Sequence, residues 1–159
     1  MRPAETEARA SPEFAPSDPD YSARVRASFD RQGAMRLIGA RLVEIAPGYC
    51  SIELPYRPDL TQQHGYVHAG IVSAIADSAG GYAGFTLFPS DASVLTVEYK
   101  LNLIAPAAGE RLIAEARVVK PGRTLAITRG EVYAETAGKR TLCAIMQQTL
   151  IVLSGKPDA

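Results

Sequence analysis

Tryptophan is absent from this 159-residue chain, and cysteine and histidine each occur only twice. Two cysteines are too few for the disulfide framework of a small secreted domain. Because Cys50 and Cys143 both lie in apolar, strand-like runs, we expect them to be buried free thiols in a reducing compartment. His64 and His68 are four residues apart, but Gly65 between them favours a loop and no cysteine lies close by, so we expect no bound metal.

The chain also lacks an excess of charge of either sign. Seventeen basic residues balance seventeen acidic ones, which argues against a nucleic-acid partner. Nothing near the N-terminus has the apolar core of a secretory signal. The apolar stretch around Asp77 is short, rich in glycine and acidic at its centre, unlike a transmembrane helix. We therefore expect a cytoplasmic protein without a membrane partner.

The length predicts one compact domain. Residues 1–17 are rich in Pro, Ala, Glu and Ser without periodicity, and we interpret them as a flexible arm. Residues 18–153 would form the domain, and residues 154–159 a polar tail. A helix is expected to start at Ser17-Asp18-Pro19 and to end at Gly33. Its apolar side chains recur on one helix face: Tyr21, Val25 and Phe29.

Most of the remaining chain has the patterns of β-strands. Alternating or continuous apolar runs predict strands over residues 37–45, 49–56, 93–104, 111–118, 124–136 and 139–153. Short connections such as Pro47-Gly48 and Ala137-Gly138 imply that these strands are antiparallel. In the third strand, one face is expected to carry Leu95, Val97, Tyr99, Leu101 and Leu103.

One segment between the second and third strands is built differently. From about Gly70 to near Phe88 it is apolar on every side and made mostly of small residues, as in a buried helix. Asp77 places a carboxylate in its middle, where burial is costly without a partner. Asp77 is either a structural fixture bonded to Ser73 one turn earlier, or the working group of a site. The predicted fold is α+β, a long curved antiparallel sheet around one buried helix.

Several segments resemble one family, the hotdog-fold acyl-CoA thioesterases of the phenylacetate-pathway (PaaI-like) type. They are His68-Ala69-Gly70 with Asp77 nine residues after His68, Thr96 to Asn102, Ala105-Pro106-Ala107, Gly109-Glu110 and Pro121-Gly122-Arg123. The likeness covers about residues 35–153 and implies the hotdog fold. It also implies hydrolysis of an acyl-CoA thioester to a carboxylate and coenzyme A, with no cofactor.

The resemblance assigns roles to individual residues. Asp77 matches the catalytic carboxylate, and Gln62 stands where many members have an asparagine that positions the water or thioester. Ala69 replaces a glycine whose backbone N–H polarises the thioester carbonyl, and alanine keeps that N–H. Thr96 falls where some members carry a serine. Asp77 would act as general base or as nucleophile, and the Ala69 and Gly70 amides would face the developing oxyanion.

Other residues are expected to support this chemistry. His68 would hydrogen-bond locally and shape the turn into the helix. Three glycines would let a partner chain or the acyl group approach the helix: Gly80, Gly81 and Gly84. Three basic residues are candidates for the phosphates of coenzyme A, with ordinary solvated charge as the alternative: Arg123, Lys139 and Arg140.

The strand over residues 93–104 would leave an exposed edge, which is a liability unless it is paired. We therefore expect a twofold homodimer, and in the family the site lies at that interface; pairs of such dimers often form tetramers. Two other functions stay open on the same fold. One is a non-catalytic acyl-CoA binding or sensing protein. The other is an enoyl-CoA hydratase or dehydratase, in which His68 and Asp77 would have to work together.

Overall fold

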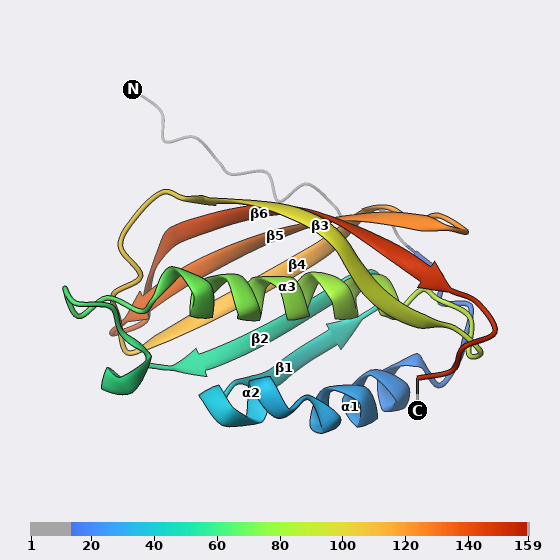
Figure 1. Ribbon diagram of the computed structural model, residues 1–159, viewed down its shortest axis with the longest axis horizontal. Coiled ribbons are helices and arrows are strands. Elements are labelled where there is room, and N and C mark those ends of the chain that lie inside the picture. Colours follow the sequence, from blue (N-terminus) through green and yellow to red (C-terminus); the bar gives the residue numbers. More distant parts are fainter. Residues whose placement is uncertain (1–13, 159) are drawn as a thin grey trace.

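A computed structural model describes residues 14–158 as one antiparallel sheet curved around a long helix (Figure 1). The helices are α1 (Tyr21–Arg31), α2 (Gly33–Ile38), α3 (Ala69–Phe85) and the short 3-10 turn η1 (Pro58–Leu60). The strands are β1 (Arg41–Ala46), β2 (Tyr49–Pro55), β3 (Ser93–Leu103), β4 (Arg111–Lys120), β5 (Leu125–Thr136) and β6 (Lys139–Leu153). Their order in the sheet is β1-β2-β4-β5-β6-β3. The predicted α+β hotdog architecture is confirmed.

The N-terminal region departs from the prediction in one place. Residues 37 and 38, expected in the first strand, belong to α2, because Gly39 ends that helix in a left-handed conformation with φ 78°. Only after this turn does the chain extend into β1. The short helix buries Met35 and Ile38 against the core. Residues 1–13 of the predicted arm lie outside the described residues, whereas Phe14 packs against the core.

The helix α3 ends at Phe85, before the predicted position near Phe88. Its end is tied to α1 by Arg24, whose side chain is 15% exposed and whose Nε lies 3.0 Å from a carboxylate oxygen of Asp18. The Arg24 guanidinium donates hydrogen bonds of 2.7 to 3.4 Å to the carbonyls of Phe85, Phe88, Pro89 and Ala92. A cation at the carboxyl end of a helix also opposes the negative end of the helix dipole. α1 is thereby fixed across the end of α3.

Two of the three glycines predicted to admit a partner or an acyl group, Gly80 and Gly84, instead make room for this chain's own sheet. A Cβ at Gly80 would overlap the buried side-chain amide of Gln148, and one at Gly84 would overlap Leu150, both on β6. The expectation that all three glycines admit a partner or an acyl group is therefore wrong for these two. Of these three glycines, only Gly81 has no atom of residues 14–158 within 4 Å of an added Cβ, so it is the one that leaves open space beside α3.

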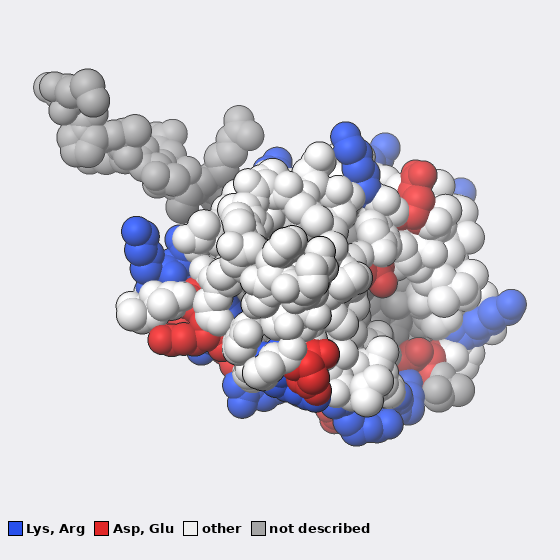
Figure 2. Space-filling view, turned by 60° about the vertical axis from the view of Figure 1, so that its left-hand side comes forward, with Lys and Arg blue, Asp and Glu red and all other residues white. Residues whose placement is uncertain are grey.

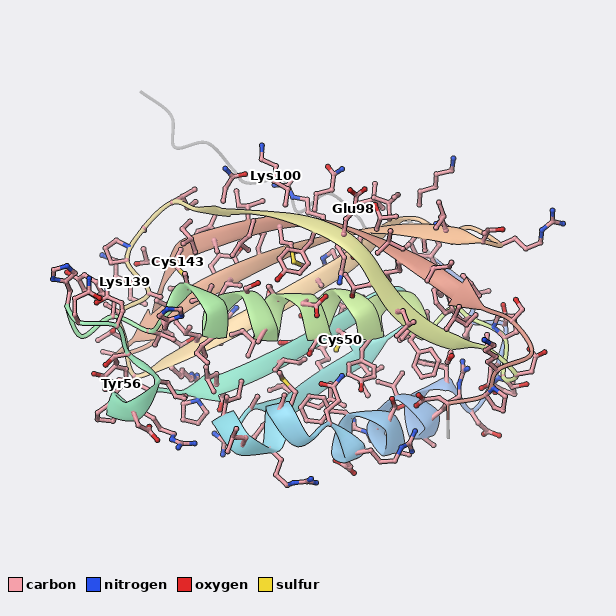
Figure 3. All side chains as sticks on the ribbon, viewed as in Figure 1. Cys50, Tyr56, Glu98, Lys100, Lys139 and Cys143 are labelled. Carbon is pink, nitrogen blue, oxygen red and sulfur yellow. The ribbon has the colours of Figure 1, made fainter. Side chains whose placement is uncertain are left out.

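A β-bulge divides the predicted apolar face of β3. Thr96 pairs with Leu150 and Glu98 with Thr149, so Val97 is an extra residue between two regular stretches. Before the bulge the even-numbered Thr96 faces α3, and after it the odd-numbered Tyr99 does, since both hydrogen-bond to side chains of α3. Figure 3 shows Glu98 and Lys100 on the outer side of β3, away from the helix.

β3 forms one edge of the sheet, as predicted. This edge and the loop after it carry apolar side chains that are 46 to 58% exposed: Leu95, Val97, Tyr99, Leu103 and Ile104. The cysteines confirm the expectation of buried free thiols, and burial raises the pKa of Cys50 to about 12 and that of Cys143 to about 11. In residues 14–158, no helix combines the length and hydropathy needed to cross a membrane.

Candidate active site

The carboxylate of Asp77 lies between the middle of α3 and two strands. Its Oδ1 accepts a hydrogen bond of 2.7 Å from the Thr96 hydroxyl on β3 and one of 2.5 Å from the Gln148 side-chain amide on β6. Ser73, the alternative partner considered from the sequence, donates instead to the Tyr99 hydroxyl at 2.6 Å. Long-range contacts, rather than a bond within the helix, therefore hold Asp77.

Asp77 opens onto a cavity of about 470 Å³ between α1, α3 and β3, lined by Ser28, Arg31, Gln32, Asp77, Ser78, Gly81, Tyr82, Val94, Leu95, Thr96 and Asp158. Gly81 lies one helical turn after Asp77 and leaves this wall of the cavity flat. Polar pairs line another part: the Ser28 and Tyr82 hydroxyls are 3.1 Å apart, and Ser78 donates to Gln32. Burial raises the pKa of Tyr82, which keeps its hydroxyl neutral.

The start of α3 exposes a single unused amide. His68 caps the helix, with its Nδ1 accepting the Gly70 N–H at 2.9 Å, which is the local role predicted for it. The amides of Ile71 and Val72 donate to the His68 carbonyl. The Ala69 N–H has no hydrogen-bond partner among residues 14–158. Of the two amides expected to face an oxyanion, only that of Ala69 is therefore available.

Gln62 and Ala69 share a second cavity of about 390 Å³, whose other walls are Tyr66, Val67, Val72 and residues 103–107. The Gln62 side-chain carbonyl accepts the His64 backbone N–H, and a bridge between Thr61 and Val67 closes this loop. Eight residues separate Ala69 from Asp77, or about 12 Å along an α-helix. Within one chain the two cavities therefore carry different parts of the predicted site.

Comparison with known sequences assigns this chain to a family. A family model described as Thioesterase superfamily matches residues 64–141. A protein of Halobacterium salinarum named as an esterase is 31% identical over 125 residues, which cover 74% of this chain and 82% of that protein. The chain belongs to the thioesterase superfamily. Human acyl-coenzyme A thioesterase 13 is 28% identical over 99 residues, covering 62% of this thioesterase and 70% of the human protein.

Comparison with solved structures supports the same family. A thioesterase family protein from Silicibacter pomeroyi is 49% identical and superposes with a TM-score of 0.84, covering 85% of this chain and 99% of that one. The Escherichia coli PaaI protein, at 16% identity, shares the fold with a TM-score of 0.77 over 87% of this chain and 96% of its own. The prediction of a hotdog-fold thioesterase enzyme is thereby confirmed at the level of the family.

The three basic residues that are candidates for the phosphates of coenzyme A do not all lie close together in one chain of this thioesterase. Arg123 precedes β5 and Lys139 follows it, and the 12 residues of that strand span about 40 Å at roughly 3.3 Å per residue. Arg140 donates to Glu115 at 2.8 Å and Glu135 at 3.1 Å. Within a single chain Arg123 therefore lies far from Lys139 and Arg140, and phosphate binding by these three candidates stays a prediction.

Lys139 lies at the end of the molecule where α3 begins (Figure 3). With that end turned forward, Figure 2 shows Lys and Arg side chains, together with Asp and Glu side chains, around the rim and mostly uncharged residues across the middle. Lys139 remains a predicted phosphate contact. The pKa of Glu135 is held below its ordinary value by hydrogen bonds from Arg111 and Arg140, so Arg140 belongs to a surface ion-pair network.

Sequence reasoning missed Gln148, although it touches Asp77. A signal was present: apolar residues alternate along β6 and face the core at Met146, Leu150 and Val152. Gln148 falls in the same row, as the polar member of an otherwise apolar face. A polar side chain in such a row is expected to hydrogen-bond a buried partner.

Proposed function

We propose that this thioesterase hydrolyses an acyl-CoA thioester to a free carboxylate and coenzyme A, without a cofactor. The observation that carries the proposal is the Asp77 carboxylate, held by Thr96 at the wall of a cavity large enough for a small acyl group. The human relative named acyl-coenzyme A thioesterase 13 supports the substrate class. The carboxylate supplies the base, and no metal or redox group is required by the reaction.

The proposed step begins with a water molecule beside Asp77. The carboxylate takes a proton from the water while the water oxygen forms a bond to the thioester carbonyl carbon. The carbonyl oxygen becomes an oxyanion, which a free backbone N–H can stabilise by about 3–4 kcal/mol. The intermediate then collapses, the carbon–sulfur bond breaks, and the coenzyme A thiolate receives the proton that Asp77 had taken.

The oxyanion donor is proposed to come from a second copy of the chain. Ser73 lies midway between Ala69 and Asp77, four residues from each. If a twofold axis passes close to Ser73, the two α3 helices run antiparallel and Ala69 of each protomer lies opposite Asp77 of the other. The open, apolar edge of β3, which contacts Ser73 through Tyr99, supports this pairing. Each site would then combine the two cavities.

Thiol release from short, medium, long and aryl acyl-CoAs tests the proposal. We expect turnover of at least one of these, and a loss of about 100-fold or more in kcat for Asp77→Asn, equivalent to about 3 kcal/mol of transition-state stabilisation. Asp91→Asn, an exposed carboxylate on the loop before β3, is the matched control. The proposal fails if the folded wild type releases no thiol from any of them, or if Asp77→Asn keeps its activity.

The same substrate separates the two roles open to Asp77. If Asp77 attacks the thioester itself, the carbon–sulfur bond breaks, coenzyme A leaves as the thiolate, and the intermediate is a mixed anhydride on the Asp77 carboxylate. Attack of H₂¹⁸O on the Asp77 carboxyl carbon then leaves the label on Asp77 after one turnover. If it acts as a general base, all of the label appears in the released acid. Mass spectrometry of the peptide around residue 77 distinguishes them.

A further inference from the structure

Gln148 is a buried polar side chain whose NH₂ group donates hydrogen bonds to Asp77 and to Thr96, the other side chain bonded to Asp77. It is 1% exposed on β6. Its Nε2 lies 2.5 Å from Oδ1 and 3.2 Å from the backbone carbonyl of Asp77, and 3.0 Å from the Thr96 hydroxyl. Its Oε1 accepts from the buried hydroxyl of Thr128 on β5 at 2.8 Å. One amide therefore links α3, β3 and β5.

The orientation of this amide follows from the chemistry of its neighbours. A carboxylate oxygen only accepts hydrogen bonds, so the NH₂ side of Gln148 must face Asp77. The carbonyl side is then left for the Thr128 hydroxyl. Gly80 makes the arrangement possible, because an added Cβ there would overlap the Gln148 amide and approach the Thr128 hydroxyl to 3.0 Å. Helix and sheet are thus shaped around the amide.

The two oxygens of Asp77 differ as a result. Oδ1 accepts from both Thr96 and Gln148. No hydrogen bond to Oδ2 occurs among residues 14–158. The other charged side chains lining the cavity, Arg31 and Asp158, are 2.6 Å apart and pair with each other. Oδ2 is therefore the carboxylate oxygen left free to meet a water molecule.

We infer that Gln148 is a positioning residue for Asp77, which fixes the rotation of the carboxylate through Oδ1 and presents Oδ2 to the reacting water. This inference rests on the proposed function and names a part of its machinery. Thr128 acts one step further away, by holding the amide. Misplacement of a reacting group by about 1 Å can cost on the order of 100-fold in rate, so the network is expected to affect turnover more than binding.

The test uses Gln148→Met, which keeps the length of the side chain and removes its donors. We expect kcat to fall about 10- to 100-fold with KM changed less than threefold. Thr128→Val should lower kcat by about 3- to 10-fold through loss of one hydrogen bond. Thr149→Val is the matched control, because its hydroxyl faces the opposite side of β6 and bonds to Glu98. We expect it to retain wild-type kcat.

A second readout does not depend on turnover. Gln148 donates a hydrogen bond of 2.5 Å to Oδ1 of Asp77, and loss of a donor changes the shielding of the carboxyl carbon. Gln148→Met should therefore change the ¹³C chemical shift of the Asp77 carboxyl at a fixed pH, whereas Thr149→Val should leave it unchanged. A wild type that hydrolyses nothing, together with a changed chemical shift in Gln148→Met, would overturn the proposed function and retain the positioning role. An active, folded Gln148→Met with wild-type kcat and an unchanged chemical shift would overturn the positioning role alone.

Discussion

The two ends of α3 differ in whether their backbone hydrogen-bonding groups have partners. At the carboxyl end the carbonyls of the last four residues are all satisfied: Tyr82, Ala83, Gly84 and Phe85 accept hydrogen bonds from the following turn, from Thr86 or from Arg24. At the amino end the Ala69 N–H has no partner within residues 14–158 and lines a cavity. One end is closed for stability, and the other leaves a donor for a ligand.

This contrast explains why one helix can serve both the core and the site. Arg24 closes the carboxyl end of α3 and fixes the helix against α1. Arg24 itself lines neither of the two cavities. The amino end can then remain under-satisfied, because its exposed amide costs little while water can reach it. A substitution that removes the free amide at the amino end should therefore lower activity. A substitution that removes the Arg24 contacts at the carboxyl end should lower stability.

The largest difference between loss of activity and loss of stability is expected for a substitution at Ala69. Ala69→Pro removes only the N–H, since proline is well tolerated as the first residue of a helix and His68 already has the extended conformation that precedes proline, with ψ 139°. We expect kcat to fall on the order of 100- to 1,000-fold, as for loss of one oxyanion donor, with little change in melting temperature. Ala69→Ser, which keeps the N–H, is the control.

The same variant tests the shared site. A dimer of one Asp77→Asn and one Ala69→Pro chain keeps one site with both groups intact if each site takes them from different protomers. Co-expression of the two inactive variants should then restore about a quarter of wild-type activity, since about half of random dimers are mixed and each carries one working site. If each chain carries its own complete site, mixing restores nothing.

Arg24→Met removes the contacts that close the carboxyl end of α3. The variant leaves the Asp18 carboxylate, 9% exposed, without its cation and removes the donors to four carbonyls. We expect a loss of about 3 kcal/mol in the free energy of unfolding, measured by urea denaturation, while kcat of the remaining folded enzyme stays within about threefold. The exposed Arg26→Met on the same helix is the control and should change stability by less than about 0.5 kcal/mol. Equal losses in the two variants would contradict the capping role of Arg24.

The sequence was sufficient for the parts of this molecule that depend on local patterns. The apolar helix with Asp77 at its centre, the strand alternation and the Ala137-Gly138 turn all follow from residue type and spacing. The bulge at Val97 does not, because it depends on how β3 pairs with β6, and it decides that Thr96 faces Asp77. The Gln148 contact was missed for a related reason. Its partners Asp77 and Thr128 are 71 and 20 residues away, and only the folded sheet brings them together.

The smallest effect is expected from the cap of α3. His68→Ala removes the acceptor of the Gly70 N–H and should lower the free energy of unfolding by about 1 kcal/mol, as for other lost helix caps. His68→Asn, which keeps a capping acceptor, should recover most of that loss, and His64→Ala should cost less than about 0.5 kcal/mol. Activity should change by less than about threefold, because the Ala69 N–H remains in place. A loss of kcat comparable to that of Ala69→Pro, without loss of stability, would instead make the His68 side chain part of the chemistry and remove the distinction between the capped amide of Gly70 and the free amide of Ala69.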